Sequence, residues 1–287
     1  MIGTAVASLL LAFLGTAFSC IGLAFLGYRR STPQRLVSWI GVVGPSCVTV
    51  AGLTLLYGLD GTASLSAGTW IELGDLAVGW KLRVGRLTAL LFVAMGLVAA
   101  TLKVSMTALE KDRPGYARRS ALLDAQLLAA AALFVADDLV LAAGAITALG
   151  LLSHLLSTRV DDQGAQTPVP LKSFMVQRVG DAFFLVGAAL LIRCAKVSDL
   201  AGLEIFATQR VEELRVGIGF LGISKATAIA LCFSIALGIK GALFPLPNWV
   251  DEEGEESLLS LGLTQTLATI GSAVFLLCRL DFVFEAS

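Results

Sequence analysis

The sequence predicts an all-α polytopic membrane protein, with about eight transmembrane helices in a single transmembrane domain that spans residues 1–287. Three observations lead to this fold class. Hydrophobic residues make up 56% of the 287 residues, and charged residues make up only 15%, against about 25% in soluble domains. The mean hydropathy is +0.84. Apolar runs recur along the chain, and several approach the roughly 20 residues that a helix needs to cross a bilayer.

Eight apolar segments are predicted to cross the membrane as helices. The first three belong to an N-terminal part, residues 1–110, and the other five form a second part, residues 120–280. The eight segments comprise residues 4–26, 37–57, 87–109, 121–136, 139–157, 174–192, 218–244 and 258–278.

The first segment has no basic residue before its apolar run and no clear cleavage site. It is therefore expected to stay as a span rather than to act as a secretory signal. The fourth and fifth segments are separated only by a few residues around Asp137 and Asp138. This short connection predicts a tight antiparallel pair of helices with the two acidic side chains at a membrane surface.

The seventh segment carries Lys240 inside an apolar helix, shortly before Pro245 and Pro247. A charged side chain near the bilayer centre costs roughly 2.5 to 3.5 kcal/mol, so such residues usually face a protein interior or a water path. Proline cannot donate a backbone hydrogen bond, so the sequence predicts an interrupted helix at residues 240–247, and broken helices often form ion sites. A helix that ends at the interface with a snorkelling lysine is the alternative.

Other ionisable residues lie in the predicted helices. Arg178 and Asp181 are three residues apart near the start of the sixth helix. This spacing puts them on one helix face, where they can pair or where Asp181 can reach a lysine. An interfacial, charged helix start is the alternative for this pair. Weaker candidates for a proton path, each of which could instead snorkel or form a local ion pair, are Lys225, Asp124 and Lys103.

Loop charges predict the orientation. The loops at residues 28–35 and 110–119 are rich in lysine and arginine, and both follow odd-numbered helices. The positive-inside rule therefore places these loops inside and both termini outside. The loop at residues 251–256, on the same predicted inner side, contains five carboxylates. It is expected to be a solvated turn, or alternatively a docking surface for a basic partner.

Several classes of chemistry are excluded by what the sequence lacks. The five cysteines are scattered, without a CxxC pair, and His154 is the single histidine. This argues against a disulfide framework, a haem or a metal site, and it leaves His154 with an expected packing or interfacial role. The sequence has no dinucleotide or phosphate-binding glycine motif, no Ser-His-Asp set and no basic stripe for nucleic acid. We expect no cofactor, no metal, no nucleic-acid partner and no redox chemistry in this chain.

The segment around the buried lysine resembles a known motif. Residues 238–249 are similar to the G-K-S-A-Q-x-P-L-x-x-W-L motif of antiporter-like subunits of respiratory complex I and of the related Mrp antiporters. Five motif residues are identical in this sequence: the lysine, the alanine, the P-L pair and the tryptophan are Lys240, Ala242, Pro245, Leu246 and Trp249.

Three further blocks follow the order of the same family. Residues 173–185 resemble its A-F-x-x-N-R-V-G-D-x-x-F-L stretch, and residues 134–140 with 150–156 resemble its fifth helix, which ends in G-L-C-S-Y-L-L. Residues 69–71 with 84–88 resemble its outer loop and the start of its third helix. The R-V-G-D block favours the distal subunit, NADH dehydrogenase subunit 5, over its sister subunits.

The resemblance implies an antiporter-like half with a broken seventh helix, similar to the N-terminal half of complex I subunit 5. It implies that Lys240, Asp181 and Arg178 lie on a proton path of a proton-translocating NADH:ubiquinone oxidoreductase. The implied partners are lipids and other membrane-arm subunits of complex I, including a chain that supplies the second half of subunit 5. The implied location is the mitochondrial inner membrane, or alternatively a bacterial cytoplasmic membrane. An Mrp-type cation/proton antiporter or an antiporter-like inorganic-carbon uptake complex is the alternative function.

Some family positions have changed. The family's fifth helix carries a W-E pair whose glutamate partners the lysine, and those places hold Ile146 and Thr147 here. The histidine of the family's eighth helix is replaced by Gln265. A lysine without that glutamate loses a charge partner, and glutamine cannot transfer a proton as imidazole does. These changes favour a structural subunit of the distal membrane arm over a proton-conducting one.

Overall fold

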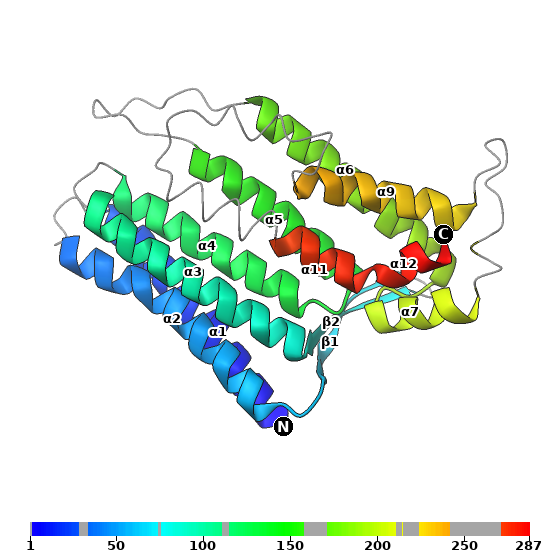
Figure 1. The fold of residues 1–287 in the computed structure, drawn as a ribbon, viewed down its shortest axis with the longest axis horizontal. Coiled ribbons are helices and arrows are strands. Elements are labelled where there is room, and N and C mark those ends of the chain that lie inside the picture. Colours follow the sequence, from blue (N-terminus) through cyan, green and yellow to red (C-terminus); the bar gives the residue numbers. More distant parts are fainter. Residues whose placement is uncertain are drawn as a thin grey trace.

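The computed structural model describes residues 2–28, 34–73, 76–110, 115–157, 171–210, 214, 224–241 and 271–287. Within these ranges the chain is helical apart from one two-stranded hairpin. The long helices run side by side, and both ends of the chain lie toward the hairpin end of the bundle (Figure 1).

Ten described helices make up most of the structure. Five of them, α1, α2, α3, α5 and α6, are long and apolar enough to cross a membrane. Each of the eight predicted segments coincides at least in part with a helix. Five coincide with the helices just named, and the other three coincide with α4, α9 and α11. The helices are α1 (Ile2–Tyr28), α2 (Gln34–Gly58), α3 (Arg86–Glu110), α4 (Tyr116–Val135), α5 (Leu139–Ser157), α6 (Leu171–Ala195), α7 (Leu200–Gln209), α9 (Lys225–Lys240), α11 (Gly271–Arg279) and α12 (Asp281–Ala286).

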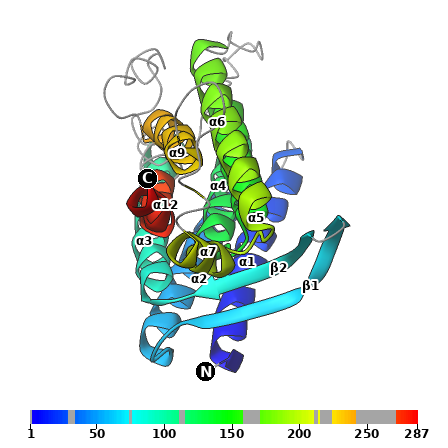
Figure 2. The same cartoon turned by 90° about the vertical axis from the view of Figure 1, so that its right-hand side faces the viewer.

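The prediction of an all-helical chain without a sheet is wrong at one place. Strands β1 (Ala63–Leu73) and β2 (Leu76–Val84) form an antiparallel hairpin. The signal is in the sequence, because Val78, Trp80 and Leu82 make every second residue of β2 apolar, which is the period of a strand. The segment contains too many polar residues to form a membrane span, so apolar run length alone does not identify it as an element. Figure 2 shows the hairpin projecting beyond α5.

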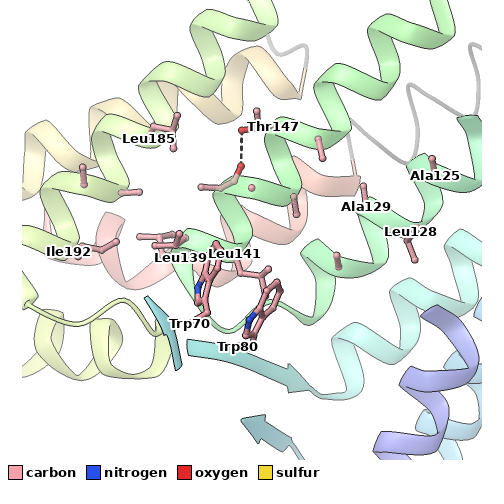
Figure 3. Close-up of a pocket in the computed structure, with 18 residues that line it drawn as sticks. Trp70, Trp80, Ala125, Leu128, Ala129, Leu139, Leu141, Thr147, Leu185 and Ile192 are labelled. Atoms are coloured by element: carbon pink, nitrogen blue, oxygen red, sulfur yellow. Dashed lines mark hydrogen bonds between the residues drawn. The ribbon is translucent and has the colours of Figure 1, made fainter. Parts of the chain in front are cut away.

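The hairpin closes one end of an apolar cavity of about 830 Å³ that is lined by α4, α5 and α6. Trp70 and Trp80, whose ring centroids are 5.3 Å apart, lie at this end near Leu139 and Leu141 (Figure 3). Both tryptophans are about half exposed. Tryptophan is enriched at the boundary between membrane and water, so the hairpin marks an interfacial level of the bundle.

The connection between α4 and α5 is the tight turn that the sequence predicts. Helix α4 ends at Val135, and helix α5 begins at Leu139. The two acidic residues between them are buried rather than solvated. Asp137 pairs with Arg83 at 3.1 Å, and Asp138 accepts a hydrogen bond from the Ser198 hydroxyl at 2.6 Å. The turn is therefore held by β2 and by the segment that follows α6.

Helix α7 is a further element that the sequence analysis missed. Asp199 is its N-cap and accepts hydrogen bonds from Gly202 N at 3.0 Å and from Lys81 Nζ at 2.9 Å. Partial burial opposes ionisation of this carboxyl, but these hydrogen bonds outweigh it and hold the pKa of Asp199 below its ordinary value. An aspartate before an apolar stretch is a known N-terminal helix signal, so α7 could have been found from Asp199.

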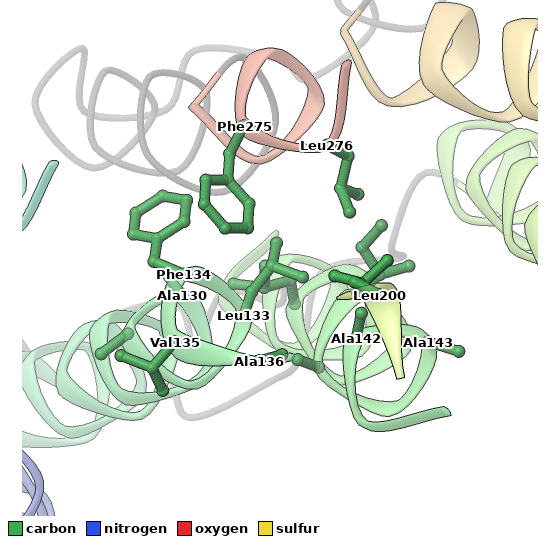
Figure 4. Close-up of a cluster of buried hydrophobic side chains, with 14 of the residues drawn as sticks. Ala130, Leu133, Phe134, Val135, Ala136, Ala142, Ala143, Leu200, Phe275 and Leu276 are labelled. Atoms are coloured by element: carbon green, nitrogen blue, oxygen red, sulfur yellow. The ribbon is translucent and has the colours of Figure 1, made fainter. Parts of the chain in front are cut away.

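The apolar core continues from α4 into the C-terminal helices. Phe134 of α4 meets Phe275 of α11 edge to face, with ring centroids 5.1 Å apart. Leu133, Leu276 and Leu200 extend the same buried cluster to one side of this contact (Figure 4). The contact joins α11 to α4, which is distant from it in sequence.

A buried ion pair joins the N-terminal helices to α4. Lys103 Nζ of α3 lies 2.7 Å from Asp124 Oδ1 of α4, and it also donates to the carbonyl and the hydroxyl of Ser120 at 2.7 and 2.9 Å. Asp124 accepts a second hydrogen bond from Ser19 of α1 at 2.6 Å. An ammonium group has three donors, and all three have acceptors here. Lys103 therefore neither snorkels nor lacks a partner.

Candidate functional site

Lys240 is the last residue of α9, a helix whose N-cap, Ser224, accepts a hydrogen bond from Thr227 N at 3.0 Å. Gly241 is the C-cap of the helix, and its amide donates to Leu237 O at 2.7 Å. The Lys240 side chain is buried, which contradicts the alternative of a snorkelling lysine. A helix end at Lys240 is where the sequence predicts the interruption. Pro245, Pro247, the acidic loop at 251–256 and Gln265 lie outside the described residues.

Lys240 meets Asp181 of α6 directly. Lys240 Nζ lies 2.5 Å from Asp181 Oδ1, and Arg178 Nη2 lies 2.8 Å from Asp181 Oδ2. The side chains of Lys240 and Asp181 are each only 5% exposed, whereas that of Arg178 is 27% exposed. The structure thus brings together the three residues that the sequence analysis ranked first. Because Asp181 is buried, an interfacial helix start is not its environment. Two cations share one carboxylate inside the bundle.

Close packing of α6 against α9 makes this contact possible. A Cβ atom at Gly180 would lie 2.9 Å from Ile239 Cγ2, and one at Gly187 would lie 3.2 Å from Cys232 Cβ. Both glycines therefore sit where the two helices approach too closely for a larger residue. Farther along the same seam, Phe184 and Phe233 pack edge to face with centroids 5.3 Å apart. This approach lets the short side chain of Asp181 reach Lys240.

Helix α5 covers the cluster with backbone rather than with a carboxylate. A Cβ atom at Gly150 would clash with Arg178 Nη2 and would lie 3.0 Å from Lys240 Nζ. Arg178 Nη2 also donates to the carbonyl of Thr147 at 3.4 Å. The Thr147 hydroxyl donates to Ala143 O in its own helix. The place where the family has a glutamate therefore supplies only a weak carbonyl contact.

The weaker candidates lie apart from this cluster. Lys103 and Asp124 form the separate pair between α3 and α4 described above. Lys225 is the first residue of α9, at the opposite end of the helix from Lys240, and it is partly exposed. Sequence reasoning missed Gly150, because the importance of a glycine appears only when its neighbours in space are known.

A methyl group at Gly150 is expected to disturb the cluster. Gly150→Ala should destabilise the folded protein by about 1 kcal/mol, the low end of the cost of overpacking, because the added Cβ displaces only the flexible ends of the Arg178 and Lys240 side chains. Gly144→Ala is the matched control, since a Cβ there meets nothing within 4 Å in the same helix. Thermal unfolding in purified membranes measures both variants. Equal midpoints would contradict the close contact at Gly150.

Comparison with known proteins places this geometry in a family. The family described as "NADH:quinone oxidoreductase/Mrp antiporter, TM" matches residues 136–287, just over half of the chain. NADH-quinone oxidoreductase subunit L of Neisseria meningitidis serogroup B is 25% identical over 266 residues, which cover 86% of this chain and 39% of the relative. NADH-ubiquinone oxidoreductase chain 5 of Debaryomyces hansenii is 22% identical over 80% of this chain and 37% of the relative. The chain thus spans about two fifths of the length of the curated relatives it matches.

Solved structures show the same fold. A chain of the Mrp complex from Dietzia sp. matches 97% of this chain with a TM-score of 0.69 at 20% identity, over 28% of its own length. A chain of respiratory complex I from Thermus thermophilus matches 95% of this chain with a TM-score of 0.60 at 22% identity, over 52% of its own length. The family match over residues 136–287 agrees with the helical fold and with the buried Lys240. It shows that the present chain belongs to the NADH:quinone oxidoreductase/Mrp antiporter family of transmembrane subunits.

Proposed function

We propose that this chain is an antiporter-like membrane-arm subunit of a respiratory NADH:quinone oxidoreductase, and that Lys240 binds and releases protons within it. The observation that carries the proposal is the buried Lys240–Asp181 pair, whose carboxylate is shared with Arg178. Ionisable residues inside a membrane bundle are rare, and they commonly belong to ion or proton paths.

The charge balance of the cluster explains why Lys240 is the exchanging group. With Lys240 protonated, the cluster holds two positive charges and one negative charge. An uncompensated charge is costly in a medium of low dielectric constant. Arginine does not give up its proton in proteins, so the excess charge can be removed only at Lys240. Asp181 and Arg178 then modulate the lysine together, in the absence of a glutamate at Thr147.

The second candidate function is that of a structural subunit that fills the distal membrane arm and does not conduct protons. Thr147 and Gln265 favour it, because they stand at places where the family has a glutamate and a histidine. An Mrp-type cation/proton antiporter is a further alternative, since a chain of an Mrp complex shares the fold. The Asp181 contact favours proton exchange, because it gives Lys240 a buried carboxylate partner despite the change at Thr147.

The partners and the location follow from the same proposal. The chain spans about two fifths of the length of its curated relatives, which are subunits of NADH-quinone or NADH-ubiquinone oxidoreductases. We propose that other membrane-arm subunits and lipids surround it. The relatives come from bacteria and from a yeast. We accordingly propose the mitochondrial inner membrane as the location, with a bacterial cytoplasmic membrane as the alternative.

Affinity purification tests the assembly. The tagged full chain, extracted from its native membrane in a mild detergent, is expected to bring down other NADH:quinone oxidoreductase subunits. Mass spectrometry of the purified material identifies these partners. Isolation as a free monomer or homo-oligomer would contradict the proposal, whereas cation/proton antiporter subunits in the same fraction would favour the Mrp alternative.

A further inference from the structure

The single histidine of the sequence lies about one helical turn from Gly150, toward the nearest end of α5. His154 is four residues after Gly150 and three residues before Ser157, where α5 ends. Residues four apart in a helix share one face and are separated by about one turn, or roughly 5–6 Å. This end of α5 is opposite to the hairpin (Figure 1). The imidazole is half-buried, so it lies between the surface and the buried amine.

Polar groups converge on the helix surface one turn below His154. The point where Gly150 would carry a Cβ lies 3.0 Å from Lys240 Nζ and 3.1 Å from Gln177 Oε1. Gln177 is itself buried. Lys240 Nζ and Gln177 Oε1 are therefore polar atoms within one helical turn of the position that carries His154. They supply hydrogen-bond partners for the water molecule that the proposal below requires between the imidazole and Lys240.

His154 and Arg178 both contact the Phe174 ring. The imidazole stacks on Phe174 of α6, with ring centroids 4.1 Å apart. The Arg178 guanidinium lies over the same phenyl ring, 5.1 Å from its centroid. Among the described residues, Arg178 is the charged group that interacts electrostatically with His154. A permanent positive charge beside two bases disfavours protonation of both at once, so a single proton can be shared between them.

We propose that His154 is the proton-exchange group between the aqueous end of α5 and Lys240. The inference rests on the proposed function of Lys240. In one direction, an imidazolium nitrogen releases its proton through a bridging water to the neutral Lys240 amine, and the neutral imidazole then takes a proton from water at the end of α5. The reverse sequence returns the proton. Imidazole suits this step because its unperturbed titration lies between pH 5 and 8, and Arg178 stays charged throughout.

Two substitutions separate proton exchange from packing. His154→Phe keeps an aromatic ring over Phe174 and removes the titrating nitrogens, whereas His154→Ala leaves a space that free imidazole can enter. NADH-driven proton uptake is measured on membrane vesicles with the assembled complex, between about pH 5.5 and 8.5. We expect both variants to lose uptake about threefold or more. Added imidazole should restore uptake in His154→Ala and should not do so in His154→Phe.

The outcomes of these measurements are decisive. Uptake at the wild-type rate and with the wild-type pH profile in His154→Phe would overturn the role of His154, as would a loss in His154→Ala that imidazole does not restore. Lys240→Met, measured in parallel, separates the two proposals. Loss of uptake in Lys240→Met with an unchanged His154→Phe overturns only the histidine's role, whereas wild-type uptake in both variants overturns the proposed function as well.

Discussion

Lys240→Met is expected to lower NADH-driven proton translocation by the assembled complex about threefold or more, while the complex still assembles. Methionine retains the length and apolar character of the side chain and removes the titratable nitrogen. Asp181 also contacts Arg178, at 2.8 Å in the wild type, and this contact is expected to remain after the substitution. The buried carboxylate is therefore not left without a positive partner, and the folded state should survive the change. Proton uptake per NADH oxidised in membrane vesicles measures the effect.

Lys225→Met is the matched control for this experiment, because it removes the same chemical group from the same helix at the end far from the cluster. We expect it to translocate protons at the wild-type rate. If the Lys240→Met complex assembles and pumps as well as the wild type, Lys240 does not exchange protons and the structural-subunit reading is correct. Complete loss of pumping with intact assembly would show that this site governs proton transfer through the whole complex.

Lys103→Met is expected to destabilise the protein by about 3–5 kcal/mol, the range for breaking one partner of a buried ion pair. The substitution leaves the fully buried Asp124 carboxylate with only Ser19 as a hydrogen-bond donor among its described contacts. Far less protein should then accumulate in the membrane, and its thermal unfolding midpoint should fall. Quantitative blotting of membranes and thermal unfolding of the purified protein measure the two effects.

The double variant Lys103→Met/Asp124→Leu distinguishes a structural pair from a proton-exchange pair. Replacing both partners of a buried ion pair by apolar residues of similar size is often neutral, so the double variant should recover most of the lost protein. Its proton uptake should also match the wild type, because every donor of the Lys103 ammonium is already bound. A stable double variant that fails to pump would place Lys103 on the proton path instead.

The part of the site that could be predicted was the identity of its charged residues. Lys240, Arg178 and Asp181 stand out in a sequence because a charge in an apolar segment is expensive, whatever its surroundings. Their distance from one another could not be predicted in the same way. Asp181 and Lys240 are 59 positions apart, and their 2.5 Å contact depends on the rotation of two helices and on the close approach at Gly180. The same holds for Lys103 and Asp124, because the sequence allowed each a local ion pair without identifying its partner.

The sequence by itself determined the membrane class, the places of the long helices and the turn at Asp137, because the bilayer imposes a length and a composition on every crossing. Only the tertiary structure decided which charges meet, where the polar hairpin folds back on the bundle, and why Gly150 must lack a side chain. These features depend on contacts between residues far apart in the chain. Local sequence patterns indicate whether a segment lies in lipid or in water, whereas the packing of the helices determines which side chains are in contact.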